Sequence, residues 1–99
     1  MILEIAQIEV TPGSEAAFEA GVAKAAPLFQ AARGCRSFRL HRSIEHPSRY
    51  RLVVGWDDVA AHMEGFRESD AFQQWRAIVG PYFAGPVQME HVETVFEGF

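Results

Sequence analysis

The segment from Tyr50 to Ser69 constrains the fold of this chain more than any other. Its first seven residues alternate, so that Tyr50, Leu52, Val54 and Trp56 form one apolar face of a strand. Asp57 and Asp58 follow at once, and aspartate caps helix N-termini well because its carboxylate accepts hydrogen bonds from first-turn amides. A helical pattern then places Val59, Met63 and Phe66 on one stripe. The segment therefore predicts a strand ending at Trp56 and a helix over residues 59–66.

The other elements can be predicted from the same kinds of pattern. Strands are expected at residues 2–10, 35–45 and 87–96, and a second helical piece at 69–79 with Ser69 as its N-cap. The first helix should begin after Ser14, with a buried stripe of Phe18, Val22, Ala25, Phe29 and Ala32. Pro27 is expected to kink or break this helix near Ala23–Ala26, and Gly34 to supply a left-handed C-terminal cap.

The order strand, helix, strand, strand, helix, strand is that of the α+β, ferredoxin-like βαββαβ fold with a four-stranded antiparallel sheet. Residues 1–99 are expected to form one domain. Helices can cover only one face of such a sheet, yet the first strand carries Leu3 and Ile5 on the other face. Because exposed apolar surface usually marks an interface, a homodimer through the open sheet face is expected.

Composition narrows the possible functions. A net charge of −4 argues against a surface for nucleic acid or anionic membranes. No apolar run is long enough to span a membrane, the first residues lack signal-peptide character, and the single cysteine Cys35 fits a reducing compartment, so a cytoplasmic protein is expected. No HExxH, Cys-x-x-Cys or Gly-x-Gly-x-x-Gly motif is present, so neither a metal nor a dinucleotide cofactor is predicted.

Several of these features together resemble the antibiotic biosynthesis monooxygenase (ABM) family. They are the Gly34-Cys35 step, Trp56 followed by Asp57-Asp58-Val59-Ala60-Ala61-His62, the Ser69–Phe72 segment and the Pro86–Val92 ending. The resemblance implies dimers with packed sheets and a pocket between the sheet and the helices of each subunit. It also implies one of several activities: cofactor-independent oxygenation of phenols or quinols, haem degradation, or small-molecule isomerisation and signal turnover.

Two subfamilies imply different site residues. The haem-degrading members have an asparagine on the first strand, a tryptophan ending the third and an iron-binding histidine on the last helix, where this chain has Gln7, Trp56 and Arg76. In the polyketide oxygenases, Trp56 and Arg76 again match, whereas His62 stands at a tyrosine position and Leu52 at an asparagine position. The missing histidine disfavours haem.

The resemblance and the residues together suggest a monooxygenase that needs no cofactor and acts with O₂ on an electron-rich aromatic, quinol or enol. Trp56 would stack the ring, Arg76 would stabilise the substrate anion, and His62 would accept its proton. Gln7, Leu52, Phe66 and Phe72 would line the pocket. Structural alternatives remain open: a core role for Trp56, and surface positions for Arg76 and His62.

Two functional alternatives also remain. One is a non-catalytic small-molecule-binding or stress-associated dimer of the same fold, and the other is haem binding or degradation. His41 and His91 are weaker site candidates, for which surface or dimer-interface positions are expected.

Overall fold

A computed structural model describes all of residues 1–99. Its sheet has four strands in the order β2-β3-β1-β4, and every neighbouring pair is antiparallel. The strands are β1 (Ile2–Glu9), β2 (Cys35–Arg42), β3 (Arg49–Trp56) and β4 (Gln88–Val92). The predicted ferredoxin-like α+β fold is confirmed.

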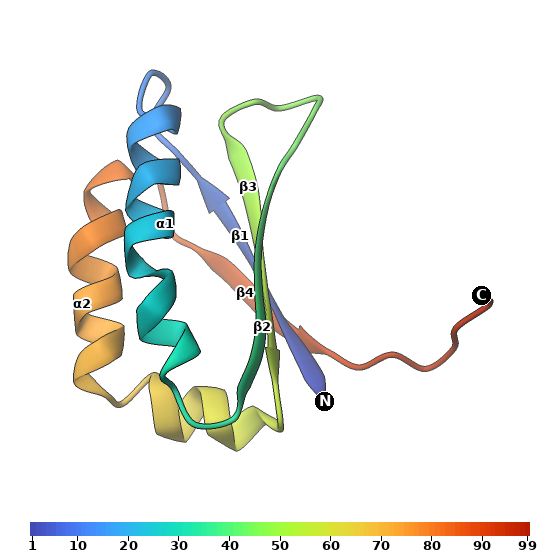
Figure 1. The fold of residues 1–99 in the computed structure, drawn as a ribbon. Helices are drawn as coiled ribbons and strands as arrows, with labels where there is room; N and C mark the ends of the chain where they lie inside the picture. Colours follow the sequence, from blue (N-terminus) through green and yellow to red (C-terminus); the bar gives the residue numbers. More distant parts are fainter.

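Both α-helices lie on the same face of the sheet, and the other face is left uncovered (Figure 1). They are α1 (Glu15–Gln30) and α2 (Asp70–Val79). Two short pieces complete the chain: the π-helix η1 (Ala61–Phe66), which follows β3, and the 3₁₀ turn η2 (Gly80–Tyr82). None of these helices has the length and apolar character needed to cross a bilayer.

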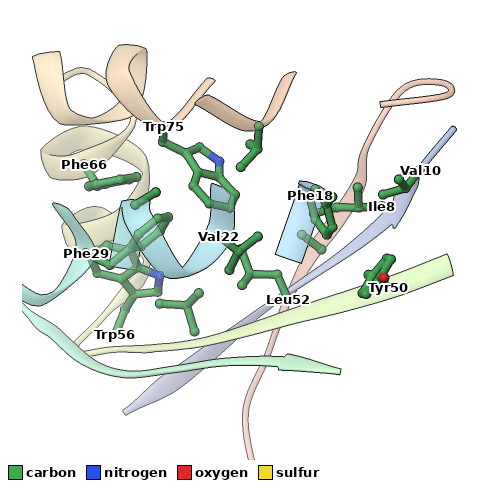
Figure 2. Packing of buried hydrophobic residues seen from close by; sticks show 14 residues of the cluster. Ile8, Val10, Phe18, Val22, Phe29, Tyr50, Leu52, Trp56, Phe66 and Trp75 are labelled. Atoms are coloured by element: carbon green, nitrogen blue, oxygen red, sulfur yellow. The ribbon is translucent and has the colours of Figure 1, made fainter. Parts of the chain in front are cut away.

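The core lies between the sheet and the helices and is rich in aromatic side chains (Figure 2). The predicted apolar face of β3 is confirmed, because Tyr50, Leu52, Val54 and Trp56 are all buried. Phe29 of α1 packs against Phe66, Trp75 and Trp56, with ring centroids 4.5, 5.0 and 6.4 Å away. Trp56 is completely buried, so its first role is to anchor the helices to the sheet.

The first helix follows its predicted pattern with two exceptions. Phe18, Val22, Ala25 and Phe29 are its buried residues, and Gly34 adopts φ +84° as predicted for a left-handed cap. However, the helix does not break before Pro27: α1 continues to Gln30, and the carbonyl of Pro27 accepts the amide of Ala31. Ser14 occupies the N-cap position, but its side chain makes no capping hydrogen bond. Ser69 does cap α2, where it accepts the amide of Phe72.

Three strands end earlier than predicted. β1 ends one residue early, at Glu9, and Val10 forms only an isolated bridge with Phe83. β2 stops at Arg42, so Ile44 lies in the following loop and is exposed. β4 stops at Val92, because Val92 already pairs with Leu3 and β1 offers almost no further partner residues. Residues 93–99 therefore form an irregular tail that leaves the body of the protein and exposes Val95, Phe96 and Phe99 (Figure 1).

The helix predicted over residues 59–66 is present, but its geometry differs. Residues 61–66 form a π-helix, in which the amide of Arg67 donates to the carbonyl of His62 five residues earlier. The wider turn changes which side chains face the core: His62 and Phe66 are buried, and Val59 is exposed. The predicted stripe through Val59 is thus wrong, and the π-helix turns His62 inward. Such π-turns often occur at functional sites.

Candidate active site

A cavity of about 330 Å³ lies between the sheet and the helices. Its apolar wall includes residues from β1, β3, β4, α2 and the segment after α2, namely Ala6, Ile8, Leu52, Trp75, Phe83 and Met89. Four ionisable side chains also line it: Glu4, His62, Arg67 and Arg76. A small, mostly apolar cavity with a few convergent polar groups is the usual form of a small-molecule site.

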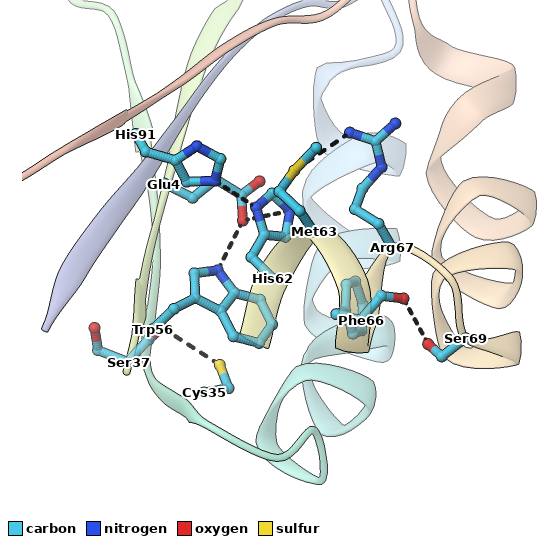
Figure 3. A network of polar contacts seen from close by, with 10 residues as sticks. All are labelled: Glu4, Cys35, Ser37, Trp56, His62, Met63, Phe66, Arg67, Ser69 and His91. Carbon is cyan, nitrogen blue, oxygen red and sulfur yellow. Dashed lines mark hydrogen bonds and ion pairs between the residues drawn. The ribbon is translucent and has the colours of Figure 1, made fainter. Parts of the chain in front are cut away.

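Glu4 is the one carboxylate among these residues and is 7 % exposed. It lies on β1 in the same orientation as Ala6 and Ile8, so the alternation of the strand directs it into the core. Its Oε1 atom accepts a hydrogen bond of 3.0 Å from Nε1 of Trp56 (Figure 3). Burial raises the pKa of Glu4, and the hydrogen bond from Trp56 and the charge of Arg67 oppose this rise.

His62 contacts both Glu4 and His91 (Figure 3). Its Nε2 is 3.3 Å from Oε1 of Glu4, and its Nδ1 is 2.8 Å from Nε2 of His91. Its ring also stacks on Trp56, with centroids 5.2 Å apart and planes 18° apart. Burial lowers the pKa of His62 to about 4, and the neighbouring His91 and the charge of Arg67 act in the same direction. His62 is therefore neutral at physiological pH.

The β-sheet register brings Glu4 and His91 together. Glu4 pairs with His91 across β1 and β4, and both side chains lie on the helix-covered face. η1 then places His62 over the pair. Four elements, β1, β3, η1 and β4, thus meet at one polar cluster, which consists of Glu4, Trp56, His62 and His91.

Two guanidinium groups lie at the opening of the cavity. Arg67 and Arg76 are exposed residues that also line the cavity. Their Cζ atoms lie 5.1 and 5.9 Å from the ring centroid of Phe72, which is a third lining residue. Because no carboxylate pairs with either guanidinium, the opening can attract an anionic group.

The structure brings four of the expected site residues to the cavity. His62, Leu52, Phe72 and Arg76 all line it. Arg76 thus lies at the cavity and not merely on the surface, and His62 is buried instead of being on an exposed helix face.

Three expected residues do not line this cavity. Gln7 is on the uncovered face of the sheet, where it accepts a hydrogen bond from Arg51, because odd-numbered residues of β1 point away from the core. Phe66 packs into the core between Phe29 and Trp56. Trp56 lies behind Glu4 and His62, so its indole supports the site without forming its wall.

Glu4 and Arg67 line the cavity but were not predicted from the sequence, and His91, expected at the surface or at a dimer interface, contacts His62. Glu4 could have been found, since it interrupts an alternating apolar face of β1 and must point where Ala6 and Ile8 point. His91 has the same phase as Met89 on β4 and is half-buried. Arg67 carries no comparable signal, because its place depends on the π-helix.

The polar cluster is not arranged as a metal site. No group of three or more His, Cys, Asp or Glu side chains in the structure has a geometry that could hold a metal ion. The nitrogens of His62 face Glu4 and His91 instead of converging with them on one point.

Comparisons with known proteins agree with this architecture. Residues 1–78 match the family model described as antibiotic biosynthesis monooxygenase. A candidate antibiotic biosynthesis monooxygenase from Bordetella bronchiseptica has 58% identity and a TM-score of 0.94, with 96% of this chain and 97% of that chain covered. One from Caulobacter crescentus has 25% identity and a TM-score of 0.83, with 96% and 90% covered.

A sequence relative of uncharacterised function, YczJ from Bacillus subtilis (strain 168), is 30% identical over 95 residues, which are 96% of this chain and 100% of YczJ. The match to the family model covers most of the chain, and the Bordetella protein shares its whole fold. The chain belongs to the antibiotic biosynthesis monooxygenase family.

Proposed function

We propose that this protein is a monooxygenase that uses no metal, flavin or haem and oxidises an electron-rich aromatic, quinol or enol with O₂. The observation that carries the proposal is the buried pair of Glu4 and His62 at a mostly apolar cavity with two arginines at its opening. Such a pair can accept a proton from a substrate bound in the cavity. Membership of the family supports the same reaction class.

The reaction requires that the substrate first loses a proton. Breaking a C–H or O–H bond leaves its electron pair on the substrate, and the resulting anion can transfer an electron to O₂. A new C–O bond then forms a peroxide, which takes up a proton and loses water to leave a carbonyl. For anthrone, C₁₄H₁₀O and O₂ would give anthraquinone, C₁₄H₈O₂, and H₂O.

The two guanidinium groups suit the anionic stages of this reaction. Arg76 and Arg67 can attract the substrate anion or a charged substituent at the opening of the cavity. Preorganised positive charge at the place where negative charge develops is a large catalytic term in many enzymes. Arg76 therefore keeps the role predicted from the sequence, which is to stabilise the substrate anion, and Arg67 is assigned the same role.

Phe72 and Trp75, and not Trp56, would stack against the aromatic ring of the substrate. Phe72 and Trp75 line the cavity and offer the aromatic surface for a flat substrate, whereas Trp56 holds Glu4 and packs on His62. Leu52 contributes to the apolar floor.

The cavity does not fit haem degradation. His62 is the only histidine that lines it, and both ring nitrogens of His62 already face protein partners. An axial iron ligand needs a free ring nitrogen, and Arg76 stands where the haem-degrading relatives place their histidine.

The homodimer is part of the proposal. Leu3, Ile5, Val53 and Val92 gather on the uncovered face of the sheet, where Ile5 pairs with Val53 and Leu3 pairs with Val92. A second copy would cover these side chains, and the exposed apolar tail offers further contact surface. The lone cysteine is consistent with a cytoplasmic location.

Oxygen consumption tests the proposal. The purified protein should consume O₂ with at least one member of a panel of anthrones and hydroquinones, and Arg76→Ala should lower this rate. Arg33→Ala is the matched control, because Arg33 is an exposed arginine in the turn after α1 that neither lines the cavity nor lies on the uncovered sheet face. Tight binding of panel members without any O₂ consumption would instead select the non-catalytic binding protein.

A further inference from the structure

We propose that Glu4, and not His62, is the catalytic base: Glu4 Oε2 takes the proton of the substrate, while Trp56 and the His91–His62 pair hold Glu4 Oε1. This assignment rests on the proposed oxygenation but concerns only its first step. It reverses the role that sequence reasoning gives to His62.

The two oxygens of Glu4 have different surroundings. Oε1 accepts the indole N–H of Trp56 at 3.0 Å and lies 3.3 Å from Nε2 of His62. An indole nitrogen can only donate, so Oε1 acts as an acceptor at this contact. A proton that arrives at the carboxylate therefore binds to Oε2.

Oε2 is the oxygen that a substrate can reach. It makes no hydrogen bond, although every fully buried polar side-chain atom of the protein has a partner. Oε2, which has no contact in Figure 3, is therefore not fully buried. Since Glu4 lines the cavity, the proposal assigns this oxygen to the cavity side.

His62 lacks an equivalent free atom. Its Nε2 faces Glu4 Oε1, and its Nδ1 faces His91 Nε2 at 2.8 Å. A neutral imidazole has one N–H and one acceptor nitrogen. If His62 donates from Nε2 to Glu4, its Nδ1 is the acceptor for the N–H of His91, and every contact has one donor and one acceptor.

His91 is then a positioning residue. It fixes the tautomer of His62, and His62 with Trp56 fixes the orientation of the Glu4 carboxylate. The aromatic stacking of His62 on Trp56 makes the two donors one rigid support. A base oriented by a second group, which is oriented by a third, is a common arrangement in enzymes.

The charges around Glu4 suit a base. Burial raises its pKa towards the working pH, where a general base is most effective. The charged or titratable groups near it are His62 and Arg67, which belong to or follow η1, His91 on β4, and Cys35 on β2, whose pKa the charge of Glu4 helps to raise. In the proposed step an Oε2–H bond forms as the substrate C–H bond breaks, and the electron pair stays on carbon.

Hydrogen exchange separates this step from oxygenation. Anthrone is incubated with the protein in D₂O under nitrogen, and deuterium at C10 is followed by NMR above the uncatalysed rate. In Glu4→Gln the rate of catalysed exchange should fall at least about a hundredfold. His62→Gln and His91→Gln should still catalyse exchange, at a reduced rate. Circular dichroism and denaturant midpoints check that each variant folds.

A second measurement requires no change at Glu4. Trp56→Phe removes the hydrogen bond that lowers the pKa of Glu4, so the acid limb of the exchange–pH profile should move to higher pH. Glu4-dependent exchange without O₂ consumption in air would support the base and overturn the oxygenation. Exchange that survives in Glu4→Gln but is lost in His62→Gln, or no exchange by the wild type at all, would overturn the assignment of Glu4.

Discussion

The indole Nε1 of Trp56 donates a hydrogen bond of 3.0 Å to Oε1 of Glu4 inside the core. The two residues lie on neighbouring strands, β3 and β1, two residues out of direct register because Trp56 pairs with Ile2 and Val54 with Glu4. A fully buried tryptophan thus joins the packing of the core to the ionisable group of the cavity.

Replacing Trp56 with phenylalanine should separate these two functions. The aromatic packing is largely kept, but Glu4 loses a buried donor, which should lower the free energy of unfolding by about 1–3 kcal/mol. Chemical denaturation measures this loss. Tyr82→Phe is the matched control, because it removes a hydroxyl that makes no hydrogen bond from a half-buried ring. An unchanged stability in Trp56→Phe would show that the Glu4 contact contributes little.

His62 should make stability depend on pH. Its pKa is about 4 in the folded protein and near 6.5 when unfolded, so the unfolded state binds more protons between these values. The stabilising contribution of neutral His62 is fully present above about pH 6.5 and is lost as the pH falls towards 4. Glu4 acts in the opposite direction, since its raised pKa favours the folded state at low pH.

The variant His62→Gln isolates the contribution of His62 to the pH dependence of stability. The difference in unfolding free energy between wild type and variant should rise between about pH 4 and pH 6.5 and then become constant. Urea titrations at several pH values measure it. A difference that is flat over this range would mean that the folded protein does not hold His62 neutral.

The ferredoxin-like fold could be predicted because each strand and helix carries its own local pattern. Alternation located the core faces of β1 and β3, and the helical stripe located that of α1. The strand ends could not be predicted, because the end of β4 depends on where β1 runs out of partners.

The site was harder to predict for the same reason. Arg76 and Leu52 were found from the family pattern, yet Glu4, His62 and His91 form a cluster only through sheet register and a π-turn. A π-helix has no clear sequence signature and shifts the inward-facing residue from Val59 to His62. Gln7 was misplaced although the alternation of β1 already put it opposite the core.

Arg67 and Arg76 should act together on the substrate. Each exposed guanidinium is worth about 1 kcal/mol or less, so Arg67→Gln or Arg76→Gln should lower kcat/KM by up to about fivefold. The double variant should lower it further, and raised salt should reduce the wild-type rate towards that of the variants. Arg33→Gln, in the exposed turn after α1, serves as the control. A double variant with wild-type kcat/KM would show that neither arginine contributes to the reaction.

A charge on the uncovered sheet face should prevent dimerisation. Val53→Glu places a carboxylate beside Ile5, its partner residue on β1, without touching the helix-covered core. Light scattering should then show a monomer with native circular dichroism. Ile44→Glu, in an exposed loop, should remain dimeric. A wild-type protein that is monomeric at micromolar concentration would contradict the proposed interface.

The most direct test of the central claim is isotope incorporation from ¹⁸O₂. If proton removal in the Glu4 cavity permits oxygenation without a cofactor, the wild-type protein should convert anthrone to anthraquinone that carries one ¹⁸O atom. Glu4→Gln should form this product at the uncatalysed rate. Anthraquinone formation that is no faster with the wild type than with Glu4→Gln, or product without ¹⁸O, would contradict the account.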